Sequence, residues 1–141
     1  MIYGIGVDLI SVPRIEKIYQ KFGSKFENKL FTKLELERSC QIKGSDYKLV
    51  FLQKSKFYAK RFVAKEAFSK ALGVGIGRGI NFCDIEIFNN NLGKPELRII
   101  NNRDKLLQII GSSNFKIHLS LSDEVKGNEA LAIAFVTIEI F

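Results

Sequence analysis

The chain has 141 residues, of which 46% are hydrophobic, and it carries a formal net charge of +7 at pH 7. This length predicts a single domain over residues 1–141, with a core of its own, and is too short for a two-domain enzyme. No apolar run reaches the roughly 18 residues that a membrane span needs. The basic charge favours an acidic protein, a nucleic acid, an anionic lipid surface or a phosphorylated ligand as partner.

The start of the chain and the cysteines indicate a cytoplasmic protein. A strand-like segment begins at Ile2, without the basic region, apolar stretch and cleavage site of a signal peptide. Cys40 and Cys83 stand alone in the sequence and show neither a CxxC motif nor another paired metal-ligand spacing. We therefore expect reduced thiols.

The first predicted element is a strand over residues 1–9, which alternate in character and are rich in Ile and Val. Asp8 is expected at the C-terminal end of this strand. Ser11 is a suitable N-cap for a helix that runs to about Phe22, where Gly23 ends it.

Two short helices and one long helix follow. Residues 25–31 predict a short helical piece, and Thr32 with Glu35 forms a capping box for a helix through about Cys40. After a turn, the apolar periodicity predicts a long helix from about 47 to 72.

The C-terminal half is expected to consist mainly of strands. It contains predicted strands over 81–88, 94–100, 115–122 and 130–140, a hairpin turn over 89–93, a helix over 102–110 and a charged turn over 123–129. The whole pattern predicts an α+β fold with an antiparallel sheet and one long central helix.

One face of the long helix is apolar except for two charged residues, because positions three and four apart share a face. This face holds Ala59, Phe62, Val63, Glu66, Ala67, Lys70 and Ala71. Loss of solvation at Glu66 is costly unless a cation or hydrogen-bond donors compensate. Arg61 and Lys65 are a like-charge pair four residues apart, which a bound anion would relieve. A metal and a phosphate ligand would satisfy these groups, and an ordinary pair of Glu66 with Lys70 is the alternative.

Asp8 is the second acid of interest. A strand-end aspartate is often only a turn residue. Together with Glu66, however, it provides two carboxylates from separate elements, with no His or Cys nearby in the sequence. Such a donor set suits Mg2+ better than Zn2+, because Mg2+ is held by one or two carboxylates, water and phosphate oxygens.

A glycine-rich loop follows the long helix, with Gly73, Gly75, Gly77 and Gly79 at alternate positions. A dinucleotide fingerprint would follow a strand and open a helix, and a P-loop would contain GK[ST], so neither motif is present. The loop is either a helix C-cap with a mobile continuation or a place where the backbone approaches a bulky phosphate ligand.

His118 is the only histidine, and alternation places it on the polar face of the strand over 115–122. A lone histidine on a strand is more often a surface residue than a catalyst. Ser120 and Ser122 lack the GxSxG elbow of a hydrolase, which argues against a serine triad.

Arg14, Lys17 and Lys21 lie three or four apart and give the first helix one basic flank. Such a flank is usually a solvated face. With an acidic protein partner it becomes a docking surface that raises the association rate.

Taken together, five segments resemble the holo-acyl-carrier-protein synthases of the 4′-phosphopantetheinyl transferase superfamily, over nearly the whole chain. They are residues 4–8 (GIGVD) with Arg14 and Ile15, 61–67 (RFVAKEA) with 70–73 (KALG), 84–87 (DIEI), 93–95 (GKP) and 118–122 (HLSLS). Any one segment is a weak signal, but five in the family's order are specific.

The resemblance implies transfer of 4′-phosphopantetheine from coenzyme A to a serine of apo-acyl carrier protein, in support of fatty acid biosynthesis, with release of adenosine 3′,5′-bisphosphate. It also implies the transferase fold and a homotrimer with its sites between subunits, and no nucleic acid or membrane partner. Asp8 and Glu66 match the Mg2+ ligands and form the catalytic group with Lys70. The acceptor of the serine proton stays open between a metal-bound water and Glu66.

The same resemblance assigns the other site residues. Coenzyme A would contact Arg61, Lys65, Lys70, Gly73, Gly75, Gly77, Pro95 and His118, and the acyl carrier protein would contact Arg14, Lys17 and Lys21. Among these, His118 matches a histidine near the 3′-phosphate of the nucleotide.

Two alternatives remain beside this interpretation. The first is a transferase for a secondary carrier protein, with the same chemistry. The second is an RNA-binding α+β domain, against which the chain shows no RNP-like aromatic motif. One departure from the family concerns the turn over 123–130, which is expected to be longer than usual.

Overall fold

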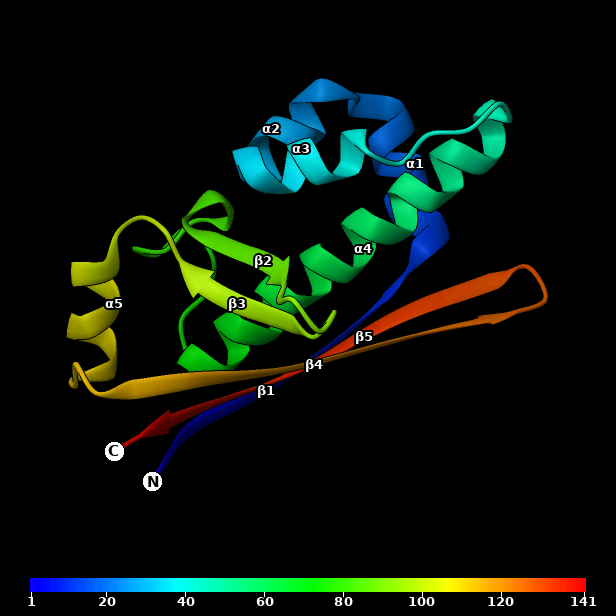
Figure 1. Ribbon diagram of the computed structural model, residues 1–141. Coiled ribbons are helices and arrows are strands. Elements are labelled where there is room, and N and C mark those ends of the chain that lie inside the picture. Colours follow the sequence, from blue (N-terminus) through cyan, green and yellow to red (C-terminus); the bar gives the residue numbers. More distant parts are fainter.

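The computed structural model describes all 141 residues and shows helices packed against antiparallel sheets, which confirms the predicted α+β class (Figure 1). The elements in chain order are β1 (Ile2–Ser11), α1 (Val12–Phe22), α2 (Ser24–Leu30), α3 (Lys33–Cys40), α4 (Tyr47–Leu72), a 3₁₀ turn (Phe82–Asp84), β2 (Ile85–Asn89), β3 (Pro95–Ile99), α5 (Arg103–Ile110), β4 (Phe115–Lys126) and β5 (Glu129–Ile140). The predicted bounds of the long helix are confirmed.

The helix α4 lies across one face of a three-stranded sheet with the strand order β1-β5-β4, and β2 and β3 form a separate hairpin beside it (Figure 1). The short helices α1, α2 and α3 cover the other side of α4. Because β5 is the middle strand, β1 and β4 are the two edges of the sheet. None of the helices combines the length and the apolar character that a membrane crossing requires.

Two glycines of β1 allow the sheet to pack directly on the backbone of α4. A Cβ added at Gly4 or Gly6 would lie 1.9 Å from the carbonyl oxygen of Ala71 or Ala67, respectively. No side chain fits in that space. This close approach brings Asp8, the next residue on the same face of β1, close to the helix.

We expect Gly6→Ala to destabilise the protein severely. Its Cβ would also lie 2.6 Å from the backbone nitrogen of Ala71, so β1 would have to move away from α4. Overpacking costs about 1–3 kcal/mol where side chains can adjust, and more against rigid backbone. Thermal unfolding measures the loss, with Gly75→Ala as control because its added Cβ meets nothing within 4 Å. A wild-type melting temperature for Gly6→Ala would contradict the close approach.

The predicted helix starts are confirmed by their caps. The Ser11 side chain accepts from the backbone of Arg14, and Thr32 and Glu35 form the reciprocal capping box. These caps satisfy donors that a helix leaves free at its first turn.

The position of Asp8 differs from the prediction. The strand β1 continues to Ser11, and Asp8 lies inside it, paired with Ala134 of β5. Asp8 therefore belongs to a paired strand, which holds its backbone more rigidly than a turn would.

The predicted charged turn over 123–129 is also wrong in its extent. Strand β4 runs to Lys126, which pairs with Glu129, so the turn contains only Gly127 and Asn128. The additional length therefore extends a hairpin and does not form a loop. The predicted strand over 81–88 likewise begins later, at Ile85, after the 3₁₀ turn.

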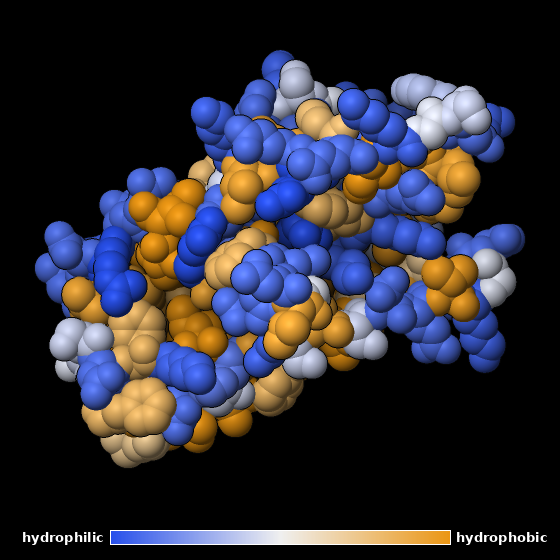
Figure 2. Space-filling model, in the orientation of Figure 1, coloured by the Kyte–Doolittle hydropathy of each residue, from blue (hydrophilic) through white to orange (hydrophobic).

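The face of the three-stranded sheet that points away from α4 is uncovered, and its β1 and β5 part is largely apolar. It carries Ile5, Val7, Leu9, Leu131, Ile133 and Phe135, which are between 39% and 58% exposed. Figure 2 shows hydrophobic side chains along the lower margin of the molecule, beneath the sheet. A patch of this kind is unusual for an isolated chain and marks an interaction surface.

Candidate functional site

Asp8, Glu66 and Lys70 form an acid–base cluster where β1 crosses α4. Asp8 shares the helix-facing side of β1 with Gly6, because alternate residues of a strand share a face. The Lys70 ammonium donates to the Asp8 carboxylate (Nζ to Oδ1, 2.9 Å) and to the carbonyl oxygen of Val7 (3.1 Å). The helix thus presents one acid and one base to the acid of the strand.

The pKa of the Glu66 carboxyl is raised. Partial burial is the largest cause, and the negative charge of Asp8 adds to it, while the Lys70 ammonium opposes both. Two carboxylates in such proximity repel each other, and a cation between them would remove that repulsion. The fold therefore brings the two acids from distant parts of the sequence into one electrostatic unit.

The donor chemistry of this unit fits Mg2+. No group of three or more His, Cys, Asp or Glu side chains that could hold a metal is present, so an ion here needs further ligands from water or from a substrate. That is the ordinary situation of Mg2+, which keeps several waters and takes phosphate oxygens beside one or two carboxylates. Asp8 and Glu66 supply hard oxygen donors of the required kind.

Lys65 does not have its expected role. Its side chain is fully buried, and its ammonium donates to the Glu35 carboxylate (2.6 Å), to the Leu30 carbonyl (2.7 Å) and to the Phe82 carbonyl (3.0 Å). These acceptors use all three donors of a lysine. The predicted contact with a phosphate is therefore wrong for this structure. Burial lowers the pKa of the ammonium, and the charge of Glu35 opposes that effect.

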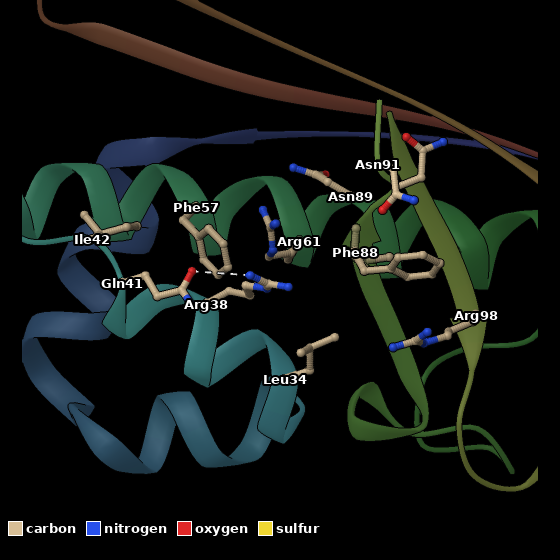
Figure 3. A pocket seen from close by; sticks show the side chains of 12 residues that line it. Leu34, Arg38, Gln41, Ile42, Phe57, Arg61, Phe88, Asn89, Asn91 and Arg98 are labelled. Atoms are coloured by element: carbon tan, nitrogen blue, oxygen red, sulfur yellow. Dashed lines mark hydrogen bonds between the residues drawn. The ribbon is translucent and has the colours of Figure 1, made fainter. Parts of the chain in front are cut away.

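Arg61 lines a pocket of about 780 Å³ between α3, α4 and the β2–β3 hairpin (Figure 3). Its guanidinium lies over the Phe57 ring, with Cζ 3.5 Å from the ring centroid, and its Nε is buried without a hydrogen-bond partner. Burial lowers the pKa of this guanidinium to about 10, so it stays charged at neutral pH. Arg38 and Arg98 also line the cavity, which we call the arginine pocket. A planar, anionic ligand would satisfy these donors.

His118 lies on the sheet face that points away from α4. It pairs with Thr137, which in turn pairs with Ile5, and directly opposed residues share a face. Ile5 points away from the side that carries Asp8. The imidazole is exposed, and its Nε2 lies 2.9 Å from the Glu139 carboxylate. The predicted polar face of this strand is confirmed.

The predicted site residues therefore do not all meet within one copy of the chain, although Asp8, Glu66 and Lys70 do. Asp8 and His118 lie on opposite edge strands and opposite faces of the sheet. Arg61 and Glu66 are five residues apart, which separates them by about 140° around the helix axis. Pro95 begins β3 and follows the hairpin turn that lines the arginine pocket, on the Arg61 side.

Comparison with known proteins decides the family. The family model of the 4′-phosphopantetheinyl transferase superfamily matches residues 4–135. The chain belongs to this superfamily. The holo-[acyl-carrier-protein] synthase of Wolbachia pipientis subsp. Culex pipiens (strain wPip) is 47% identical over 98% of both chains. The crystal structure of holo-[acyl-carrier-protein] synthase from Neisseria meningitidis gives a TM-score of 0.80 at 39% identity over 99% of both chains.

A second solved structure adds a ligand to the comparison. It is a holo-(acyl-carrier-protein) synthase from Bacillus anthracis in complex with CoA (3′,5′-ADP). Its TM-score is 0.74 at 37% identity, over 100% of this chain and 99% of that chain. The resemblance seen in the five sequence segments is therefore confirmed at the level of the family.

The glycine loop of this superfamily member begins as the predicted helix C-cap. Gly73 ends α4 with a left-handed backbone (φ 83°), and Gly77 is also left-handed (φ 91°). A Cβ added at Gly73, Gly75 or Gly77 would meet nothing within 4 Å. The left-handed backbone therefore accounts for glycine at positions 73 and 77. At all three positions the neighbouring space would accommodate a side chain.

The basic flank of α1 is exposed and borders an apolar groove that the sequence did not reveal. Arg14, Lys17 and Lys21 are all solvent-exposed. The groove has a volume of about 420 Å³ and is lined by Ile18, Phe22, Phe26, Leu30, Phe62 and Phe82, with Lys25 and Lys29 also contributing. The basic flank of α1 and the apolar groove thus lie side by side. This arrangement fits a partner helix that carries acidic residues beside apolar ones.

Proposed function

We propose that this chain transfers 4′-phosphopantetheine from coenzyme A to a serine of apo-acyl carrier protein, in support of fatty acid biosynthesis. The observation that carries the proposal is the cluster of Asp8, Glu66 and Lys70, two carboxylates and an ammonium that fit a metal-bound pyrophosphate. Membership of the superfamily and the relatives' names as synthases support the same reaction. The coenzyme A complex of the Bacillus anthracis protein supports the choice of co-substrate.

In the proposed reaction the serine oxygen attacks the β-phosphorus of coenzyme A. A phosphorus–oxygen bond forms to the serine, the bond to the nucleotide breaks, and adenosine 3′,5′-bisphosphate leaves. Asp8 and Glu66 would hold Mg2+, which when bound supplies charge neutralisation at the pyrophosphate. Lys70 is placed to stabilise the charge that develops on the phosphate oxygens. Glu66 would also accept the serine proton, because its carboxylate belongs to the cluster that faces the pyrophosphate.

We further propose that each site is completed by a second copy of the chain, in a homotrimer. The uncovered apolar face of the sheet supports this assembly, because it offers each copy a surface to bury. The separation of the site residues also supports it. One copy would contribute Asp8, Glu66 and Lys70, and its neighbour would contribute Arg61 with the arginine pocket, Pro95 and His118. The glycine loop over 73–77 would line the same space.

The acyl carrier protein would dock on the basic flank of α1 and the adjoining apolar groove. We expect Arg14→Ala to raise the KM for the carrier about fivefold, the usual limit for one exposed ion pair, with little change in the KM for coenzyme A. Steady-state kinetics at two salt concentrations measures both constants. Lys43→Ala, in the exposed turn before α4, is the control. Equal effects on both KM values would remove Arg14 from the docking surface.

An intact-mass assay tests the proposed function. The chain is incubated with coenzyme A, Mg2+ and apo-acyl carrier protein, and the carrier should gain about 340 Da, the mass of the phosphopantetheine group. A gain only with a carrier from secondary metabolism would assign the substrate differently. No gain with any carrier, together with tight RNA binding, would contradict the enzyme assignment.

A single domain over residues 1–141 and a cytoplasmic location are further parts of this proposal.

A further inference from the structure

A buried ion pair lies one turn further along α4 from Arg61. Lys65 follows Arg61 by four residues, so both side chains leave the same flank of the helix. Lys65 pairs with Glu35, and both side chains are completely buried (0% exposed). Arg61 takes part in none of the five ion pairs of the molecule.

Glu35 accepts three hydrogen bonds, and none of them comes from Arg61. Its Oε1 accepts from Lys65 and from the backbone of Thr32 (2.9 Å), and its Oε2 accepts from the backbone of Ile87 (3.0 Å). The nearby carboxylate nevertheless acts on Arg61, since its charge raises the pKa that burial lowers. Glu35 is therefore close enough to attract Arg61, but three of its roughly four acceptor positions are already used by other donors.

The same network fixes the walls of the arginine pocket. Thr32 donates to Glu86 (2.6 Å), and the other oxygen of Glu86 accepts from Arg98 at 2.7 Å. Glu35 holds the backbone of β2 at Ile87, next to the pocket. The two acids Glu35 and Glu86 thus lie among three cations. Glu35 pairs with Lys65 and Glu86 with Arg98, whereas Arg61 has no carboxylate partner.

We infer that Lys65 is a positioning residue, which occupies Glu35 and thereby keeps Arg61 available to an anionic ligand. This inference rests on the proposed function, because the ligand would be the phosphate-bearing nucleotide of coenzyme A. Without Lys65, the buried carboxylate lacks its cation, and a buried charge must find another. Arg61, one turn away, is the cation that can turn to it, and the pocket then loses its free positive charge.

Two variants that break the same ion pair test the inference, because they should act in opposite ways on ligand binding. Lys65→Met leaves Glu35 to capture Arg61, so its dissociation constant for adenosine 3′,5′-bisphosphate should rise about tenfold or more, the effect of losing one charged hydrogen bond. Glu35→Gln removes the competing acid. It should lower the melting temperature, because Lys65 loses its counter-charge, yet bind the probe at least as tightly as the wild type.

The double variant Lys65→Met/Glu35→Gln should regain wild-type binding, since nothing then attracts Arg61. Isothermal titration of the assembled protein with adenosine 3′,5′-bisphosphate gives the constants. Lys60→Met, which breaks the partly exposed pair with Asp123, is the matched control.

Equal loss of affinity in Lys65→Met and Glu35→Gln, or no loss in Lys65→Met, would overturn the inference while transfer by the wild type continues. If Lys65→Met does not fold, weaker binding by Glu35→Gln would overturn it. A wild-type chain that neither binds the probe nor modifies a carrier would contradict the proposed function itself.

Discussion

Glu66→Gln should abolish transfer while making the folded chain more stable. The glutamine cannot supply the second negative oxygen donor for Mg2+ and cannot accept the serine proton. Removal of one stabilising group from an active site typically lowers kcat by a factor of about 10²–10³. Glu66 would have two functions, so we expect a loss at the upper end of this range or beyond it. Intact-mass kinetics with saturating coenzyme A measures the residual rate.

The gain in stability follows from the raised pKa of Glu66. The folded state binds this proton more tightly than the unfolded state does. The free energy of unfolding therefore falls as the pH rises from the unfolded pKa through the folded pKa, and at neutral pH the ionised carboxylate destabilises the fold. Glutamine is neutral at every pH, so it removes this penalty. The melting temperature of Glu66→Gln should exceed that of the wild type at pH 7 without metal.

A matched control separates this effect from a general loss of charge. Glu37→Gln changes an exposed glutamate of α3 and should leave both the rate and the melting temperature unchanged. The assignment of Glu66 would be wrong if the Gln variant transferred phosphopantetheine at the wild-type rate. The electrostatic account would be wrong if the variant melted below the wild type at pH 7.

Phe135→Glu should separate the assembly and remove activity. Phe135 is 46% exposed on the uncovered sheet face and pairs with Val7, so a carboxylate there would be buried without a partner in any sheet-mediated interface. The particle mass should fall to the 16.0 kDa of one chain. Because each site would lose the half supplied by its neighbour, transfer should fall by about two orders of magnitude.

Light scattering and the transfer assay measure the two consequences in the same sample. Tyr47→Glu is the control, since Tyr47 is also an exposed aromatic residue but lies at the start of α4. It should leave both particle mass and rate unchanged. A Phe135→Glu protein that is monomeric and fully active would show that one copy contains a complete site.

Local signals explain which parts of the fold could be predicted. The ends of α4 depend on the Asp46 cap and on Gly73, and the capping box of α3 depends on residues three apart, so both are visible in a short stretch of sequence. The predicted extent of the β4–β5 hairpin was too short, because the charged composition of residues 123–126 is typical of a turn. In the structure they pair with β5 over a two-residue turn.

The candidate site was predictable only as far as one element determines it. The acid at Glu66 interrupts an apolar helix face, and that local conflict identified it. The burial of Lys65 could not be predicted in the same way, because it depends on Glu35, which lies 30 residues earlier and also looks like an ordinary capping residue. The separation of His118 from Asp8 follows from the strand order, which no local pattern reveals.

Subunit mixing tests most directly the central claim that a transferase site combines Asp8 and Glu66 of one copy with Arg61 of the next. Glu66→Gln and Arg61→Ala chains are each inactive alone and are refolded together in equal amounts. Random trimers should then contain intact sites, and the carrier should gain its added mass at about a quarter of the wild-type rate. Mixing Glu66→Gln with Asp8→Asn, which damage the same half, should restore nothing. No recovery in the first mixture, with trimers formed, would contradict the shared site.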